Sequence, residues 1–293
     1  MQQLRKIITL SQPIQIFLSL MTYGLGLGLA RYLGASLSAE PQFLGGIIIV
    51  LMMSGSNYLK EYFRPFNEPI TLGEARLERE MLRKTLFMVS ISFLVLVAIL
   101  LFMLARDGYI QLEVAFILLL FISLSLAMAI PPVRLVNRGW GELATAIQIS
   151  SLSPSLAFLF IYGRFHRILT IYTFPLLLLS LAYFLALNFP SYSDDMKFER
   201  RSLLISMTWQ RAVPFHNGLI AMAYLFFAAT PFLGIPFGLI WPGLLTLPLA
   251  GYQIFGLRNI SEGSKPNWII FVVSATTIFG LTTYLLALTL WLR

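Results

Sequence analysis

Long apolar runs alternate with short polar connections along the whole chain. A helix needs about 20 apolar residues to cross the hydrocarbon core of a bilayer. The longest run is about twice that length and contains Pro231 and Pro236, which favour two helices over one. The pattern therefore predicts an all-α membrane protein with nine spans in one integral membrane domain, 1–293. The expected spans are 7–30, 41–59, 85–105, 114–133, 143–163, 168–190, 212–230, 236–257 and 267–291.

Basic residues are distributed unevenly between the two sets of connections. Loops that are rich in Lys and Arg usually face the cytosol. With nine spans, sixteen basic residues fall on the side of the amino terminus and five on the other side. We therefore expect a cytosolic amino terminus and a carboxyl terminus on the opposite side. The five are Arg31, Arg106, Arg164, Arg167 and Arg293.

The composition supports a membrane protein and argues against a soluble domain, a nucleic-acid-binding protein and a Cys or His metal site. The chain is 58% hydrophobic and 12% charged, whereas soluble domains carry about 25% charged residues. The net charge of +8 is explained by the one-sided basic loops, so we expect no nucleic-acid partner. There is no cysteine, and the two histidines, His166 and His216, have no metal-ligand spacing.

Two polar segments adjoin the ends of predicted spans. In the first, Asn57, Lys60, Arg64 and Asn67 are spaced three, four and three residues apart. They share one helix face if the second span continues to Arg64, although Pro65 disfavours helix there. Spacings of four, three and four occur in the second segment, at Asn188, Tyr192, Asp195 and Glu199. Such stripes either face a cavity or cap helix ends at the headgroup level.

These segments resemble the signatures of the UbiA-type intramembrane prenyltransferases. The first family signature is an Asn-Asp pair, two further aspartates at four-residue intervals and Asn-x-Pro. Here Ser56-Asn57, Lys60, Arg64 and Asn67-Glu68-Pro69 stand at those positions. The second signature runs Asn-x-Phe-Pro-Asp-Tyr-x-x-Asp, then a basic residue, Ser or Thr, and Leu. It is similar to Asn188, Phe189, Pro190, Ser191, Tyr192, Asp195, Arg201, Ser202 and Leu203.

A third stretch carries the most specific match. Pro131-Pro132-Val133-Arg134-Leu135, followed by Arg138-Gly139-Trp140-Gly141-Glu142, is similar to a connection in the same family. The resemblance covers the whole chain, including Pro13 at the opening of the first helix. A fainter similarity, in Asn67-Glu68-Pro69 and Ser191, is to the chlorophyll synthase branch.

The resemblance implies nine helices around a central, lipid-accessible cavity that binds an isoprenoid diphosphate. In the family, aspartate-bound Mg²⁺ neutralises the leaving diphosphate while an aromatic acceptor captures the allylic carbon. In this chain only Asp195 stands at one of the usual carboxylate positions, and Asp194, Glu61 and Glu68 are off-register. A cation about 5 Å from Mg²⁺, at an effective dielectric near 20, costs on the order of 7 kcal/mol. Lys60 and Arg64 therefore argue against a conventional metal site.

The predicted site follows from this comparison. Basic and amide side chains are expected to bind a diphosphate or another anionic head directly: Asn57, Lys60, Arg64, Asn67, Arg134 and Arg201. The second segment contributes Asn188, Ser191, Tyr192 and Asp194, and Asp195 is the catalytic residue if the protein is active. No metal ligand is assigned beyond Asp195 as a weak candidate. We interpret Arg76, Arg79, Arg83 and Lys84 as positive-inside anchors.

Three functions remain open from the sequence. The first is a non-catalytic or divergent relative that acts as a structural or isoprenoid-, quinone- or pigment-binding subunit of a membrane complex. The second is an active prenyltransferase moving a polyprenyl or phytyl group to an aromatic or tetrapyrrole acceptor with Mg²⁺. The third is a transporter, because polar segments in two halves also suit that class. The expected partners are the bilayer, such a lipid and other membrane subunits.

Overall fold

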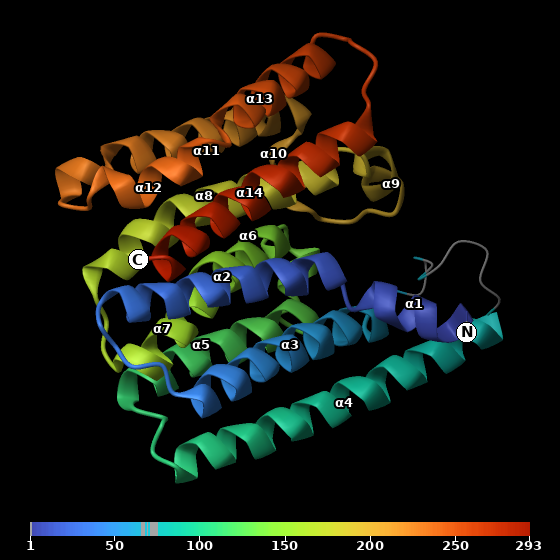
Figure 1. The fold of residues 1–293 in the computed structure, drawn as a ribbon. Helices are drawn as coiled ribbons and strands as arrows, with labels where there is room; N and C mark the ends of the chain where they lie inside the picture. Colours follow the sequence, from blue (N-terminus) through green and yellow to red (C-terminus); the bar gives the residue numbers. More distant parts are fainter. Residues whose placement is uncertain (1, 66–67, 69, 71–75) are drawn as a thin grey trace.

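The computed structural model describes residues 2–65, 68, 70 and 76–293, and all regular secondary structure in these ranges is helical (Figure 1). Three short segments of other helical type interrupt the α-helices: η1 Leu135–Asn137, η2 Gln148–Leu152 and η3 Thr230–Leu233. The α-helices are α1 Gln2–Leu10, α2 Pro13–Tyr32, α3 Ala39–Tyr62, α4 Arg76–Arg106, α5 Leu112–Ala129, α6 Gly141–Ile147, α7 Ser153–Tyr162, α8 Arg167–Asn188, α9 Tyr192–Lys197, α10 Leu203–Met207, α11 Trp209–Ala229, α12 Phe237–Leu244, α13 Leu247–Ser261 and α14 Trp268–Trp291.

The apolar runs form the helices that their lengths predict. Within the described ranges, eight helical segments are long and apolar enough to cross a membrane, and a bent pair adds a ninth. That pair is α12 and α13, whose axes differ by 41°. The prediction of an all-α membrane protein is therefore confirmed.

The first predicted span is wrong at its start. It is divided at Ser11 and Gln12, and Gln12 has a φ of 61°. Pro13 follows as the first residue of α2, where its missing N–H costs no intrahelical hydrogen bond. The preceding residues form the separate helix α1. Its Lys6 Nζ lies 3.0 Å from Glu78 Oε1 on α4.

The fifth span contains a change of helical pitch. A π-helical turn at Gln148–Leu152 separates α6 from α7. Gln148 Nε2 donates to Ser125 Oγ of α5 at 2.6 Å, and Ser153 Oγ lies 2.6 Å from Ser19 Oγ of α2. These buried polar contacts connect the span to both neighbours, as helices in lipid commonly do.

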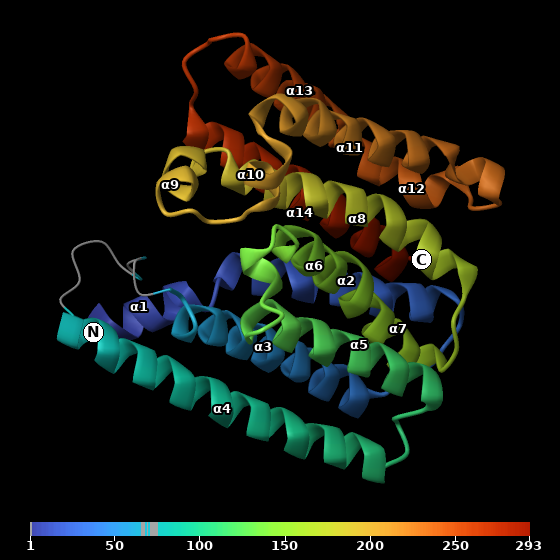
Figure 2. The same ribbon diagram turned by 180° about the vertical axis from the view of Figure 1, so that it is seen from behind.

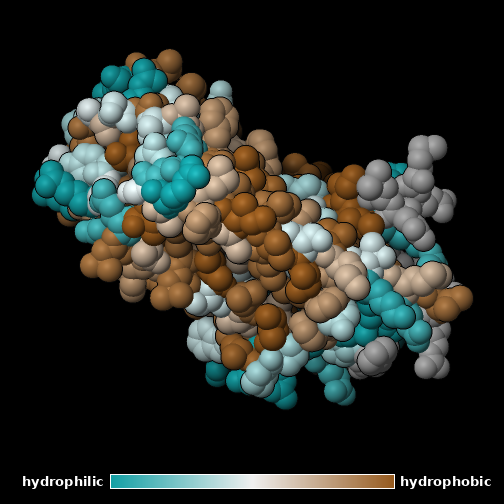
Figure 3. Space-filling model, turned by 90° about the horizontal axis from the view of Figure 1, so that it is seen from below, coloured by the Kyte–Doolittle hydropathy of each residue, from teal (hydrophilic) through white to brown (hydrophobic). Residues whose placement is uncertain are grey.

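The helices form a layered bundle with two distinct ends. Figures 1 and 2 show α4 at one edge against α3, and α11 to α13 at the other edge, with α2, α8 and α14 between them. The two chain termini lie at opposite ends, and α9 and α10 lie at the end of the amino terminus. Hydrophobic side chains dominate the middle of the face in Figure 3, whereas hydrophilic ones gather toward its ends. This distribution fits a body that crosses a bilayer.

Candidate functional site

A cavity of about 350 Å³ opens at the end of the bundle where α1, α3, α6, α8 and α9 meet. Its lining is divided between charged side chains and apolar ones. A site of this composition can hold a molecule with a charged head and a hydrocarbon body. The apolar lining residues include Leu10, Met128, Phe184 and Leu187.

The end of α3 forms the first wall. Asn57 Nδ2 donates to the Ser11 carbonyl oxygen at 2.8 Å, and its Oδ1 accepts from Lys60 Nζ at 2.9 Å. Asn57 is buried. Through these two hydrogen bonds it connects Lys60 to the break between α1 and α2. Because α3 ends at Tyr62, Arg64 lies beyond the helix. Its Nη2 is 2.7 Å from the Glu61 carboxylate.

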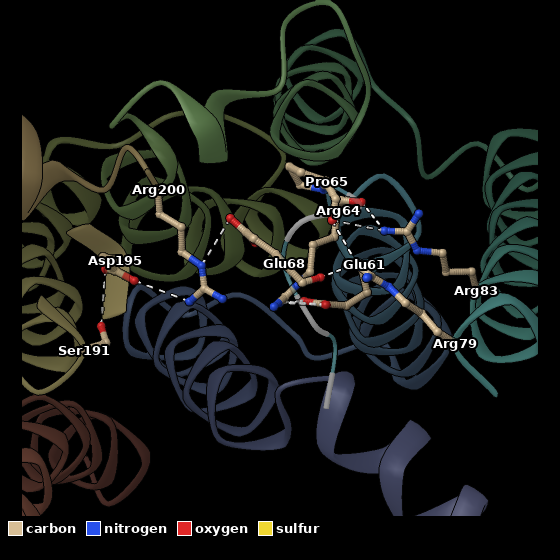
Figure 4. A network of polar contacts seen from close by, with 9 residues as sticks. All are labelled: Glu61, Arg64, Pro65, Glu68, Arg79, Arg83, Ser191, Asp195 and Arg200. Carbon is tan, nitrogen blue, oxygen red and sulfur yellow. Dashed lines mark hydrogen bonds and ion pairs between the residues drawn. The ribbon is translucent and has the colours of Figure 1, made fainter. Parts of the chain in front are cut away.

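Two arginines of α4 hold the segment that follows α3. Arg79 Nη2 donates to the carbonyl oxygens of Pro65, at 2.9 Å, and of Glu68. Arg83, which is buried, donates to the carbonyl oxygens of Arg64 and Pro65. Both arginines therefore position the backbone beside the cavity (Figure 4), a role that their interpretation as positive-inside anchors did not include.

The second wall is built from α8, α9 and the turn after α9. Asp195 Oδ1 lies 3.4 Å from Arg200 Nη1, and Ser191 Oγ donates to Asp195 Oδ2 at 3.3 Å. Arg200 also reaches Glu68, with Nε 3.3 Å from Oε1 (Figure 4). Burial raises the pKa of the Asp195 carboxyl, while Arg200, Ser191 and Ser202 act to lower it. Burial thus outweighs the polar contacts in this pocket.

Arg134, in the segment between α5 and α6, and Glu142, in the first turn of α6, also line the cavity. Arg134 Nε is buried without a hydrogen-bond partner among the described residues. Burial lowers the pKa of this guanidinium, and the charge of Glu68 opposes the change. Glu142 Oε1 accepts from Asn188 Nδ2 and from the Leu203 N–H, the latter at 3.1 Å. Its Oε2 is buried and has no partner in the described part of the chain.

Most of the predicted site residues meet in this cavity. Asn57, Lys60, Arg64, Arg134, Asn188, Ser191 and Asp195 all line it. Asn67 lies outside the described residues. Tyr192 instead packs edge-on against Trp209, with ring centroids 5.5 Å apart, and Asp194 is exposed. Arg201 is also exposed and is not among the lining residues.

The sequence did not predict a role for Arg200. This residue lines the cavity, where its neighbour Arg201 was expected. Glu199 follows α9 and has a left-handed φ of 54°, so helical spacing does not apply at this point. Glu142 was visible as part of the third motif but had no role assigned. The cavity also takes in Gln12, Gln15, Glu61, Glu68, Asn137 and Ser202.

These residues do not fit a magnesium ion. Within the described ranges, no group of three His, Cys, Asp or Glu side chains could hold a metal. Mg²⁺ requires several oxygen ligands in octahedral geometry. Here arginines are paired with Glu61, Glu68 and Asp195, and the Glu142 carboxylate accepts from an amide and a backbone N–H.

Comparison with solved structures identifies the fold. A UbiA homolog from Archaeoglobus fulgidus bound to GPP and Mg²⁺ superposes with a TM-score of 0.63 at 18% identity, over 96% of this chain and 99% of that chain. The form bound to DMAPP and Mg²⁺ gives 0.64 at 17% identity over the same shares. Digeranylgeranylglyceryl phosphate synthase gives 0.55 at 13% identity, over 100% of this chain and 98% of that chain. No family model and no curated protein matches the chain. The chain therefore has the UbiA fold, as its motifs predicted.

Proposed function

We propose that this protein binds the anionic head of an isoprenoid lipid in the cavity without a divalent metal. In this proposal it acts as an isoprenoid-, quinone- or pigment-binding subunit of a membrane complex, and not as a metal-dependent transferase. The fold supports an isoprenoid ligand because UbiA homologs of this fold are bound to GPP and DMAPP. The apolar lining residues supply surface for a hydrocarbon tail.

One observation carries the proposal. Four cations and four carboxylates line the described part of the cavity, but the cations do not all form salt bridges with these carboxylates. Arg64 is paired with Glu61, and Arg200 is shared by Glu68 and Asp195. Among the described residues, Lys60 and Arg134 form no salt bridge, and Arg134 keeps a buried N–H without an acceptor. An anionic head would supply that acceptor and both countercharges.

The test is binding of GPP to the purified protein in EDTA, measured by calorimetry. We expect binding that Lys60→Gln and Arg134→Gln each weaken by about tenfold, the size of one charge-assisted hydrogen bond. Arg138→Gln is the matched control, because this residue is exposed in the same segment and does not line the cavity. GPP binding that requires Mg²⁺, or that both variants leave unchanged, contradicts the proposal.

The alternative is an active prenyltransferase. The observation in its favour is that Glu61, Glu68, Glu142 and Asp195 line one cavity, and carboxylates are the ligands that Mg²⁺ prefers. This function predicts diphosphate release from GPP in the presence of Mg²⁺ and its loss in Asp195→Ala. We expect no such release.

The orientation in the membrane is also a proposal. We infer that the amino terminus and the cavity end face the cytosol, because sixteen of the 21 basic residues lie in the connections on that side. The ligand head would then be delivered from the cytosolic leaflet.

A further inference from the structure

Arg200 joins two segments that are far apart in the sequence. Glu68 follows α3, whereas Asp195 belongs to α9, and the guanidinium lies between their carboxylates (Figure 4). The distances are 3.3 Å from Nε to Glu68 Oε1 and 3.4 Å from Nη1 to Asp195 Oδ1. One side chain thus spans the gap between the walls of the cavity.

Several local contacts hold Arg200 in this place. Its backbone N–H donates to the Asp195 carbonyl oxygen at 2.9 Å, after the left-handed turn at Glu199. Its guanidinium carbon lies 5.5 Å from the centroid of the Phe198 ring, a cation–π distance. Arg200 is therefore placed by its backbone and by a ring, as well as by the two carboxylates.

The burial of the two acids makes this cation necessary. The side chains of Asp195 and Glu68 are only 7% and 10% exposed. Two buried carboxylates facing each other without a cation would be strongly unfavourable. A planar guanidinium suits two acceptors at once, because its N–H groups point in fixed and different directions.

We propose that Arg200 is a tethered cation that takes the position a divalent ion would occupy between Glu68 and Asp195. It neutralises part of their charge and connects the two walls, so the protein carries its own cation and excludes a metal there. This inference goes beyond the proposed function, because it concerns a cation site and is tested with no isoprenoid present.

The test uses the full-length protein, purified in detergent and freed of metal, with Mn²⁺ binding followed by electron paramagnetic resonance. Arg200→Gln leaves two acids and a space between them, so we expect Mn²⁺ to bind about tenfold or more tightly than to wild type. Arg201→Gln is the matched control, since it removes the same charge from the next residue, which is exposed. It should bind Mn²⁺ as weakly as wild type.

A double variant locates the new site. Adding Glu68→Gln to Arg200→Gln removes one proposed ligand and should abolish the gain. Mn²⁺ should also raise the unfolding temperature of Arg200→Gln and leave that of wild type unchanged. Tight Mn²⁺ binding by wild type, no gain in Arg200→Gln, or a gain that persists in the double variant would each overturn the inference.

Arg200→Met provides the same test if the Gln variant does not fold. Its unbranched apolar side chain keeps much of the arginine stem but carries no charge. We expect this variant to bind Mn²⁺ more tightly than wild type. Equal affinity for the two proteins would contradict the tethered-cation role.

Discussion

Glu142 connects three helices through one carboxylate oxygen. Its Oε1 accepts from Asn188 at the end of α8 and from the N–H of Leu203 at the start of α10. The residue itself lies in the first turn of α6. Removing the carboxylate would leave two partly buried donors without an acceptor. We therefore expect Glu142→Ala to lower the free energy of unfolding by about 2 kcal/mol.

Glu142→Gln separates the negative charge of this side chain from its ability to accept hydrogen bonds. Its amide oxygen can still accept both hydrogen bonds, so we expect it to lose less than half as much stability as the Ala variant. Urea or thermal unfolding in detergent, followed by tryptophan fluorescence, measures both. Glu262→Ala is the control, because its salt bridge to Arg258 is exposed and contributes little. Equal losses for Glu142→Ala and Glu262→Ala would show that the connection does not stabilise the bundle.

At the residue scale, the sequence predicts which residues line the cavity better than it predicts which side chains pair with each other. The motifs predicted that Lys60, Arg134 and Asp195 share one site, and all three line the cavity. They could not identify Arg200, because the chain leaves the helical conformation at Glu199, just after α9, and a regular spacing does not continue across that residue. Nor could spacing show that an arginine would be shared by two acids from separate segments. Such pairing depends on tertiary contacts between distant parts of the chain.

At the element scale, the crossing of α2 and α7 depends on a glycine. A Cβ at Gly26 would lie 2.8 Å from the Cα and the carbonyl carbon of Pro154, and closer still to its carbonyl oxygen. Real Cβ atoms do not approach backbone this closely, and backbone cannot rotate away as a side chain can. We expect Gly26→Ala to force the helices apart and to cost about 1–3 kcal/mol, as overpacking does.

Gly24 offers a control on the same helix. A Cβ there meets nothing within 4 Å, and alanine is the better helix former. Gly24→Ala should therefore keep or slightly raise the unfolding temperature, whereas Gly26→Ala should lower it. A similar unfolding temperature for both variants would argue against close packing of α2 on α7.

Hydrophobic length predicted which segments are helices, but it did not locate their breaks. The predicted span that starts at Ile7 runs across Ser11 and Gln12, which are too few polar residues to divide it by hydropathy, yet α1 and α2 separate there. The cause is local, since Pro13 favours a helix start and Gln12 takes a left-handed conformation. By contrast, Pro231 and Pro236, which favoured two helices in the sequence, lie between α11 and the bent pair.

At the scale of the whole molecule, the fold gathers polar segments from distant parts of the chain at one end. The segment after α3, the connection before α6 and the region around α9 all contribute to one cavity. The opposite end carries the carboxyl terminus (Figures 1 and 2). If the positive-inside rule applies, the cavity end is cytosolic, and the other end is exposed outside.

The absence of cysteine from the sequence makes this orientation directly testable. Asp107, between α4 and α5, and Ser264, between α13 and α14, are both exposed and fall on opposite sides of the predicted topology. In intact cells, a membrane-impermeant maleimide should label Asp107→Cys at once and Ser264→Cys only after permeabilisation. The wild-type chain offers no thiol and is the blank. The reverse labelling pattern would place the cavity end outside and remove the argument for delivery from the cytosolic leaflet. Labelling of both variants in intact cells would mean that the two loops share one side, which an odd number of spans between them does not allow.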